Sequence, residues 1–557
     1  MAHWERGAQV RKLEEVDSHQ QRVVSERQAA AAAGVARGTL RHWRQRRAGC
    51  ELAPEVVAFF DSATGLELLH RLVMAAHLVM TLLGCGGVRL VCRFLELSGL
   101  SAVVAASYGA QQQVAMALEA AVVAFGQAER ARLGAAMPAR TIGLCEDETF
   151  HPEVCLVGIE PVSNFIVLER YAEGRGSAQW TAALSAALEG LPVKVHQVTS
   201  DQAKGLCHHV TQALGAQQGP DLFHVQHEIS RATAAALAAR LRRAEQALTE
   251  AEQALAEQQA RQAAYERGPR RPGRPPDFAR RLHQRRSDLA GAQGHLEKVQ
   301  AHQAEAKAVR RELSAAYHPY DLASGEIQAP EQVAGRLARC WQRLEALAET
   351  AALPERCRQR LRKAQRVGQS LVATVCFYFA TVTAKVEALS LPQALETALY
   401  AHLIPALYLE RVAERSTDRG QRQALREQVS ALLAPLQASA GPLAGLSPED
   451  RRLLEQVATD CAQLFQRSSS CVEGRNGQLS LHHHSRHRLS DRKLAALTTV
   501  HNYLIQRPDG TTAAERFFGQ RPARLFEAVL SQVRLPGRPA RKRPPPKKPP
   551  HLRLVET

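Results

Sequence analysis

The sequence predicts an α/β core in the order β-β-β-α-β-α-β, with a long all-α insertion and an all-α region before it. Three observations predict this fold class. Short β-rich runs are confined to residues 140–226, helical periodicity fills the chain on both sides, and residues 230–467 contain no strand-like run. The chain has 557 residues, 45% of them hydrophobic, which is enough for several buried cores.

The composition favours a polyanionic partner. The net charge is +17, and nucleic acid is the commonest partner of such a basic chain. Composition alone equally fits a basic protein whose genome favours Ala and Arg. The 11 cysteines include no CxxC pair, and no signal-peptide pattern is present, so we expect reduced thiols in a cytoplasmic protein. The apolar run 72–88 is short for a membrane span and predicts a buried helix.

The N-terminal 50 residues fit a helix-turn-helix. In ERQAAAAAGVARGTLRHWRQ (26–45), Ala30 is small where two helices cross, Gly34 suits the turn, and Val35, Leu40 and Trp43 face inward. The second helix then presents hydrogen-bond donors to DNA, namely Arg37, Thr39, Arg41, His42 and Arg44. The alternative is an ordinary helical hairpin with a cationic face. Apolar helices follow over residues 51–135, broken at 84–87 and 98–99.

The core is predicted from short runs bounded by turn residues. Strands are expected at 141–146, 154–160, 164–170, 193–200 and 221–226, and helices at 178–188 and 202–214. Asp147 ends the first strand, in LCEDETF, and Asp201 ends the fourth, in VTSDQAKGL. If these strands are neighbours, the two carboxylates lie close together and repel, and a divalent cation with a preference for oxygen ligands, Mg²⁺ or Mn²⁺, relieves the repulsion.

The other acids of LCEDETF alternate to the opposite strand face. We expect Glu146 and Glu148 to pair with nearby arginines. Taken singly, Asp147 and Asp201 are as well explained as solvated turn residues, because Asp is common at strand ends. The topology is what favours a site.

This strand order with these aspartates resembles the ribonuclease H-like core of DDE transposases. DETF and VTSD resemble the first two motifs of that superfamily. SSSCVEGRNGQ, with Glu473, lies 34 residues before Arg507 in VHNYLIQRPDGTTAAERFFG (500–519), which resembles the end of many insertion-sequence transposases. The resemblance covers residues 140–230 and 465–520. It implies that Asp147, Asp201 and Glu473 hold two Mg²⁺ or Mn²⁺ ions for phosphoryl transfer on double-stranded DNA.

Two departures accompany this resemblance. The 272 residues from Asp201 to Glu473 exceed the gap in compact members, and a helical insertion at this point, found in some lineages, accounts for them. Glu455 and Asp460 are further candidates for the third acid. Glu473 is preferred because Asn476 and Gly477, one helical turn on, leave room beside a metal.

Histidines near these motifs are further candidates. DLFH (221–224) matches an Asp-x-x-His signature of some DDE superfamilies, so His224 is expected to border the active site. A zinc site formed by Cys207, His208, His209, His224 and His227 is an alternative, but its spacing matches no closed four-ligand pattern. HHHSRH (482–487) is expected to face DNA.

Residues 230–313 predict two long antiparallel helices, a coiled-coil hairpin joined by the basic stretch RGPRRPGRPPDF (267–278). RRPGRPP (270–276) and LPGRPARKRP (535–544) resemble AT-hooks, which makes Arg271, Arg274 and Arg538 DNA-binding candidates; chance in Pro/Arg-rich linkers is the alternative. From Arg534 onward the chain is expected to be a disordered basic tail.

The predicted organisation has six parts: a helix-turn-helix (1–50), a helical DNA-binding or linker domain (51–138), the first part of the catalytic core (139–229), the helical insertion (230–467), the last part of the core (468–525) and the tail (526–557). The predicted function is a DNA transposase that acts on the ends of its own element as a dimer or larger assembly, with the hairpin as the contact between copies. The rivals are another ribonuclease H-like nuclease, such as a resolvase, and an inactive helix-turn-helix regulator. The regulator requires that Asp147, Asp201 and Glu473 do not converge.

Overall fold

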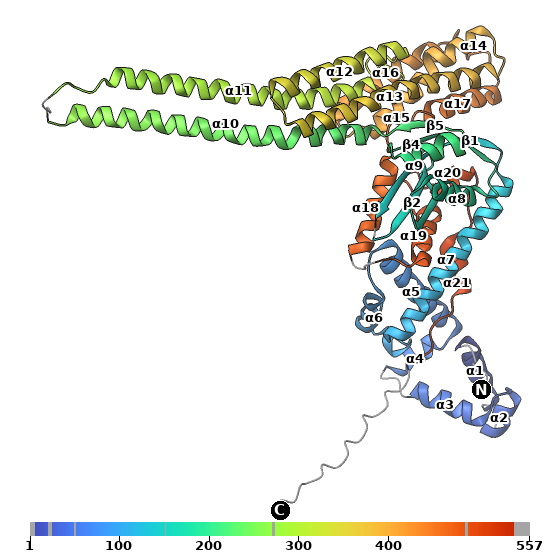
Figure 1. The fold of residues 1–557 in the computed structure, drawn as a ribbon. Coiled ribbons are helices and arrows are strands. Elements are labelled where there is room, and N and C mark those ends of the chain that lie inside the picture. Colours follow the sequence, from blue (N-terminus) through green and yellow to red (C-terminus); the bar gives the residue numbers. More distant parts are fainter. Residues whose placement is uncertain are drawn as a thin grey trace, which may run out of the picture.

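The computed structural model describes residues 6–20, 25–48, 52–150, 152–269, 273–484 and 488–539. These residues are mostly helical and include one mixed five-stranded sheet. The sheet lies between small helices of the N-terminal region and a large helical region, from which a long helical hairpin extends sideways (Figure 1). The expected combination of an α/β core with extensive all-α regions is confirmed at this level.

The sheet has the strand order β3-β2-β1-β4-β5. β1 pairs antiparallel with β2, β2 pairs antiparallel with β3, and β1-β4 and β4-β5 are parallel. The first and fourth strands are therefore neighbours, which is the condition for Asp147 and Asp201 to lie close together. The strands are β1 (Arg140–Phe150), β2 (Val154–Glu160), β3 (Phe165–Ala172), β4 (Val193–Ser200) and β5 (Gln217–Pro220).

The prediction of a strand at 221–226 is wrong. The fifth strand ends at Pro220, and the Asp221 carboxylate accepts a hydrogen bond from the backbone N–H of Phe223 at 2.7 Å. This contact caps the helix α10 (Leu222–Arg267), so residues 222–226 form its first turn rather than a strand. The helix expected at 202–214 is a short helix, α9 (Lys204–His208), continued by a π-helical turn (His209–Ala213).

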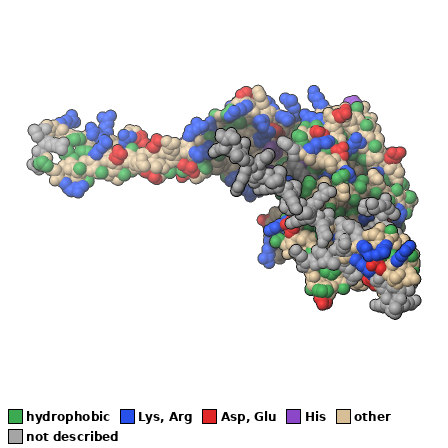
Figure 2. Space-filling model, turned by 90° about the horizontal axis from the view of Figure 1, so that it is seen from below, with side chains coloured by type: hydrophobic (Ala, Val, Ile, Leu, Met, Phe, Trp, Pro, Cys, Tyr) green, Lys and Arg blue, Asp and Glu red, His purple; other side chains and the backbone are tan. Residues whose placement is uncertain are grey.

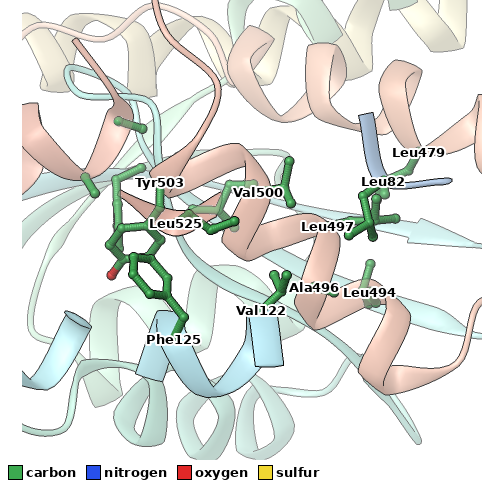
Figure 3. Packing of buried hydrophobic residues seen from close by; sticks show 14 of the residues in the cluster. Leu82, Val122, Phe125, Leu479, Leu494, Ala496, Leu497, Val500, Tyr503 and Leu525 are labelled. Atoms are coloured by element: carbon green, nitrogen blue, oxygen red, sulfur yellow. The ribbon is translucent and has the colours of Figure 1, made fainter. Parts of the chain in front are cut away.

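Helices from both ends of the chain pack on the sheet and share one hydrophobic core with it. In Figure 3, Phe125 and Val122 of one helix lie beside Tyr503 and Ala496, respectively, of another that comes almost 400 residues later in the sequence. The two helices are α7 and α19, and α19 also packs on β3. The helices that surround the sheet are α7 (Tyr108–Ala136), α8 (Ser177–Leu188), α18 (Ser470–His484), α19 (Asp491–Tyr503), α20 (Ala513–Phe518) and α21 (Leu525–Gln532).

The N-terminal region contains three helices, and a tight turn at Gly34 joins the second to the third. Gly34 has a φ of 65° between the two helices, and Ala30, Val35, Leu40 and Trp43 are buried. They form a small core with Leu13 and Val16 of the helix before them. The three helices are α1 (Arg6–Gln20), α2 (Glu26–Ala32) and α3 (Arg37–Ala48). The connection to α7 contains α4 (Pro54–Phe60), α5 (Ala63–His77), a π-helical turn (Leu78–Leu83), α6 (Val88–Leu97) and a 3-10 turn (Leu100–Ala102).

The helical region after β5 has a core of its own. Aromatic rings at its centre include Tyr320, Tyr378, Tyr408 and Phe465, and the Tyr320 and Tyr378 hydroxyls lie 3.2 Å apart. The predicted hairpin is formed by α10 and by the helix Phe278–Ala316 (α11), which pack along each other. The remaining helices are α12 (Pro330–Thr350), α13 (Glu355–Glu387), α14 (Gln393–Ala398), a π-helical turn (Leu399–Leu403), α15 (Ile404–Arg415), α16 (Arg419–Gln437) and α17 (Pro448–Gln463).

Residues 534–539, which the structure describes, form contacts with the N-terminal region of the chain. The backbone N–H of Ala105 donates to the Gly537 carbonyl at 2.8 Å, and Arg538 forms an ion pair with Asp61. The expectation of disorder from Arg534 is therefore wrong for residues 534–539, which lie against the N-terminal helices. The predicted start of the tail at residue 526 is wrong as well, because α21 forms there and buries Val529 in the core around the sheet. Residues 540–557 lie outside the described residues.

Two described helical segments, Ala63–Leu83 and Glu355–Glu387, are long and apolar enough to cross a membrane by length and composition alone. Core helices of soluble proteins meet the same criterion, and both segments contribute residues to the two large cores. The described cysteines are all free thiols.

Candidate metal centre

Three side chains from distant parts of the sequence meet beside β1, just after the point where its pairing with β4 ends. Asp147, His224 and Glu473 each offer one ligand atom, and these atoms lie within 4.8 Å of one another. Asp147 and His224 are half-buried, and Glu473 is exposed. Two carboxylates and an imidazole at this separation form a donor set of the kind that binds divalent transition metals.

The parallel pairing of β1 and β4 positions Asp147 next to Asp201. Glu146 pairs with Ser200 at the last register position, so the next residues along both strands are these two aspartates. Neighbouring strands lie about 4.8 Å apart, which explains why the charge of Asp201 acts on Asp147. The ligand atoms of Asp201 nevertheless lie outside the compact group of three, and its carboxylate accepts a hydrogen bond from the N–H of Ala203 at 3.0 Å.

His224 is held in the first turn of α10. The backbone N–H of Asp221, the capping residue, donates to the Ser200 carbonyl at 3.0 Å, which fixes the helix start to the end of β4. The other oxygen of Asp221 accepts hydrogen bonds from the N–H of Ser469, at 3.2 Å, and from its hydroxyl, at 2.5 Å. Asp221 therefore joins the strand, the helix that carries His224 and the segment that leads to Glu473.

Glu473 lies in the first turn of α18, which packs against β1 and β2. An acidic side chain is favoured there by the partial positive charge of a helix N-terminus. The position of α18 is fixed by Arg475, whose guanidinium donates to both carboxylate oxygens of Glu169 on β3, at 2.8 and 2.7 Å. The hydroxyl of Thr498 donates to the same carboxylate at 2.6 Å. Although burial alone raises the pKa of Glu169, Arg475 and Thr498 bring it below its usual value.

The electrostatics of Asp147 fit a cation site. Burial, with a smaller contribution from the negative charges of Asp201 and Glu473, raises the pKa of Asp147 to about 7. The N–H of Glu148, which donates to Asp147 at 2.8 Å, and the imidazole of His224 oppose it. A carboxyl with such a pKa is only partly ionised near neutral pH, and a bound cation would favour its charged form.

The prediction that Glu146 and Glu148 pair with arginines is confirmed for Glu148 and wrong for Glu146. Glu148 pairs with Arg175 at 3.1 Å and accepts a hydrogen bond from the Trp180 indole at 3.2 Å. Glu146 instead is fully buried and faces His209 at 3.8 Å, because its strand face is covered by the π-helical turn after α9. Burial raises the pKa of Glu146, and His209 partly opposes this.

The five residues of the alternative zinc site are spread over different surroundings. His209 is buried against Trp180, His208 lies 3.0 Å from the Ser177 hydroxyl, and the exposed His227 stacks on Phe223. Of this set, only His224 belongs to the ligand group found among the described residues. His482–His484 form the end of α18, and residues 485–487 lie outside the described residues.

Of the predicted DNA-binding residues whose side chains the structure describes, half are exposed and half are half-buried. On α3, Arg37 and Arg41 are exposed and pair with Glu26, at 3.7 and 3.2 Å, while Arg44 pairs with Asp17 at 2.5 Å and Thr39 is half-buried. The His42 side chain and all of Arg271 lie outside the described residues. Arg274 is exposed at the hairpin turn, whereas Arg538 is held by Asp61. Figure 2 shows further Lys and Arg side chains near the outer end of the hairpin.

Sequence reasoning missed the residues that position the site. Asp221 was assigned to a strand, although an Asp directly after a Gly-Pro pair is a recognisable helix-capping signal. Glu169 and Arg475 are 306 residues apart, and neither sits in a motif that marks the other as its partner.

The comparisons with known proteins match only the C-terminal part of the chain. A family model described as "Family of unknown function (DUF6399)" matches residues 399–545. The match runs from the helical region into the sheet-covering helices and includes α18 with Glu473. No significant match was found among curated proteins or among solved structures.

Proposed function

We propose that this protein is a metal-dependent DNA transposase of the DDE type, with a ribonuclease H-like catalytic core. The observation that carries the proposal is the meeting of Asp147, His224 and Glu473 within 4.8 Å, although the sequence separates the first from the last by 326 residues. The pairing of β1 with β4 supports the proposal as well, because it brings Asp201 next to Asp147. The rival interpretation as an inactive regulator requires that Asp147, Asp201 and Glu473 do not converge; the meeting of Asp147 with Glu473 speaks against it, whereas the ligand atoms of Asp201 lie outside the group.

The donor set fits a divalent ion. Asp147 and Glu473 supply the oxygen ligands that Mg²⁺ and Mn²⁺ prefer, and the imidazole of His224 suits Mn²⁺ better than Mg²⁺. The group of three is compact enough for one ion. A second ion requires a further carboxylate, and Asp201 is the one whose charge reaches Asp147.

A bound ion would supply Lewis-acid activation of a water or 3′-hydroxyl and stabilisation of a leaving oxygen. The role of the protein is to keep the ligand side chains at fixed positions relative to one another. Rigid attachment of α10 and α18 to the sheet, through Asp221 and through Arg475, keeps His224 and Glu473 at fixed distances from Asp147.

The rest of the chain supplies DNA contacts and assembly in this proposal. The helix-turn-helix and the helices up to α7 bind the terminal repeats of the element, with the Arg37 and Arg41 side chains exchanging Glu26 for phosphates or base edges. The hairpin α10–α11 joins copies into a dimer or larger assembly. The protein works in the cytoplasm of its host cell, at the nucleoid.

The test is strand cleavage of a duplex that carries an element end, with Mg²⁺ or Mn²⁺. Asp147→Asn and Glu473→Gln should each lower cleavage by at least about a hundredfold while end binding persists. The matched controls are Asp460→Asn and Glu455→Gln, exposed acids of α17 that should leave cleavage unchanged. Cleavage at the wild-type rate in Asp147→Asn would sink the proposal.

The substrate separates the two enzymatic readings. A transposase requires the element ends and joins them to target DNA. A resolvase-like nuclease instead cuts branched DNA or hybrids of any sequence. Comparison of an end-bearing duplex with a four-way junction, using the same metal-dependent activity, decides between them.

A further inference from the structure

A cavity of about 590 Å³ lies in the helical region, where α11, α15 and the segment before α18 meet. Its size is within the range of pockets that hold small ligands. It is separate from the candidate metal centre, since none of Asp147, His224 and Glu473 lines it.

The lining of this cavity is strongly cationic. It includes four arginines, Arg311, Arg411, Arg415 and Arg467, and none of its lining residues is Asp or Glu. Arg311 and Arg415 are exposed at the rim, while Arg411 and Arg467 lie deeper. Tyr408, His318 and serine side chains add hydrogen-bonding groups.

The two deeper arginines each keep a buried nitrogen without a partner. Arg411 donates through Nη1 to the carbonyls of Ala462 and Phe465, at 3.1 and 3.3 Å, yet its Nη2 has no hydrogen-bond partner. Arg467 donates through Nη2 to the carbonyl and hydroxyl of Ser314, at 2.6 and 2.8 Å, yet its Nε has none. A buried cation without a counter-ion is costly, so this arrangement is suited to an anion that enters from outside.

The pKa values agree with the geometry. Burial, together with the neighbouring charge of Arg415, lowers the pKa of Arg411 to about 10. Burial also lowers the pKa of Arg467. The nearby carboxylate of Asp221 is already used by Ser469 and by the N–H of Phe223.

We propose that this cavity binds a phosphate group, carried either by the backbone of a DNA strand or by a free phosphate compound. Guanidinium groups match the oxygen geometry of phosphate, and their charge-assisted hydrogen bonds are among the strongest available. The inference does not depend on the proposed chemistry, because it uses none of the metal-centre residues.

The position of the cavity links it to the metal centre. The segment Gln466–Ser470 forms part of its wall and continues directly into α18, which carries Glu473. The Cys145 thiol, two residues before Asp147, donates to the Ser468 carbonyl at 3.6 Å. An anion in the cavity therefore contacts the segment that holds the third acid against β1.

The experiment uses the full chain and two probes, inorganic pyrophosphate and a short DNA duplex. Calorimetric titration measures both affinities for the wild type, for the rim variant Arg311→Gln/Arg415→Gln and for Arg411→Lys. The rim variant changes only exposed side chains, so its fold should be intact. Arg451→Gln, which removes an exposed arginine of α17, is the matched control.

If a free phosphate compound is the ligand, pyrophosphate binds the wild type and the variants lose about tenfold or more, while DNA affinity is unchanged. If DNA is the ligand, the variants weaken duplex binding and pyrophosphate competes with the duplex. Either result should persist in Asp147→Asn, which separates this site from the metal centre. The inference is overturned if neither affinity differs between the wild type and both variants by more than the Arg451→Gln control does.

Discussion

Arg475 and Glu169 form a bidentate ion pair that is sealed inside the protein, with side-chain exposures of 5% and 0%. The pair connects α18, the helix that carries Glu473, to β3, which is an edge strand of the sheet. The candidate metal centre thus depends on a contact that lies outside it.

Breaking this pair should lower stability and loosen the metal centre together. Arg475→Met leaves the Glu169 charge buried without its main partner, at a cost of about 3–5 kcal/mol in the free energy of unfolding. Glu169→Leu/Arg475→Met should lose less than the sum of the single variants. Denaturant unfolding and Mn²⁺ titration measure the two effects.

A matched control is the exposed bidentate pair of Arg71 and Glu527, at 2.9 and 2.8 Å. Arg71→Met should change stability far less and Mn²⁺ affinity not at all. Equal effects of Arg71→Met and Arg475→Met would contradict the role assigned to the buried pair.

Metal affinity should depend on the protonation of Asp147. Since its pKa is raised to about 7, a proton must leave before an ion binds, and Mn²⁺ affinity should fall about tenfold for each pH unit below that value. The stability of the metal-free protein should depend on pH in the opposite direction and fall as the pH rises. The protonated carboxyl stabilises the fold at low pH, and this contribution is lost as the pH rises through about 7.

Calorimetry between pH 5.5 and 8 measures the affinity, and thermal unfolding without metal measures the stability. Asp147→Asn should remove this pH dependence of stability, whereas Asp460→Asn, at an exposed site, should retain it. A flat Mn²⁺ affinity across the range would rule out Asp147 as a ligand with this pKa.

The helix-turn-helix should depend on Gly34 through its backbone alone. At φ 65°, an added Cβ would meet nothing within 4 Å, so Gly34→Ala costs only conformational strain, about 1–2 kcal/mol. Hydrogen exchange over residues 25–48 should become faster.

Gly38 provides the control for Gly34. It also has open space around it but lies in α3 with ordinary helical geometry. Gly38→Ala should therefore slow exchange slightly, by up to about 1 kcal/mol of added local stability. The same response of both variants would argue against the turn geometry.

The junction of α7 and α19 should not tolerate a methyl group at Gly126. An added Cβ would lie 2.6 Å from the Thr499 hydroxyl oxygen, so Gly126→Ala should cost about 1–3 kcal/mol through overpacking. Thr499→Ala in the same chain should restore most of the lost melting temperature. Gly109→Ala, on the same helix but in open space, should cost little, and an equal loss there would refute the packing argument.

The strand pattern was readable because apolar alternation and turn residues bound it on both sides. β2 and β4 have the predicted limits, and β1 and β3 differ by a few residues. β5 was missed because Gln217–Pro220 contains no apolar run, and its pairing with β4 depends on neighbours that the sequence does not display.

The candidate site was predictable only where a residue and its strand end coincide. Asp201 follows directly from the end of β4. The prediction that Asp147 ends the first strand is wrong, because β1 continues to Phe150; Asp147 instead follows the last residue of β1 that pairs with β4. Glu473 depended on a resemblance and His224 on a short motif. Glu146 could not be placed correctly, because the burial of a carboxylate beside His209 results from the tertiary packing of the π-helical turn.

One continuous helix carries His224 in its first turn and reaches the basic turn of the hairpin at its far end, as Figure 1 shows. α10 has 46 residues and neither Gly nor Pro within them, so it spans about 70 Å without a weak point. A displacement of the hairpin tip is therefore transmitted along α10 to the imidazole of His224, because no Gly or Pro interrupts the helix between them.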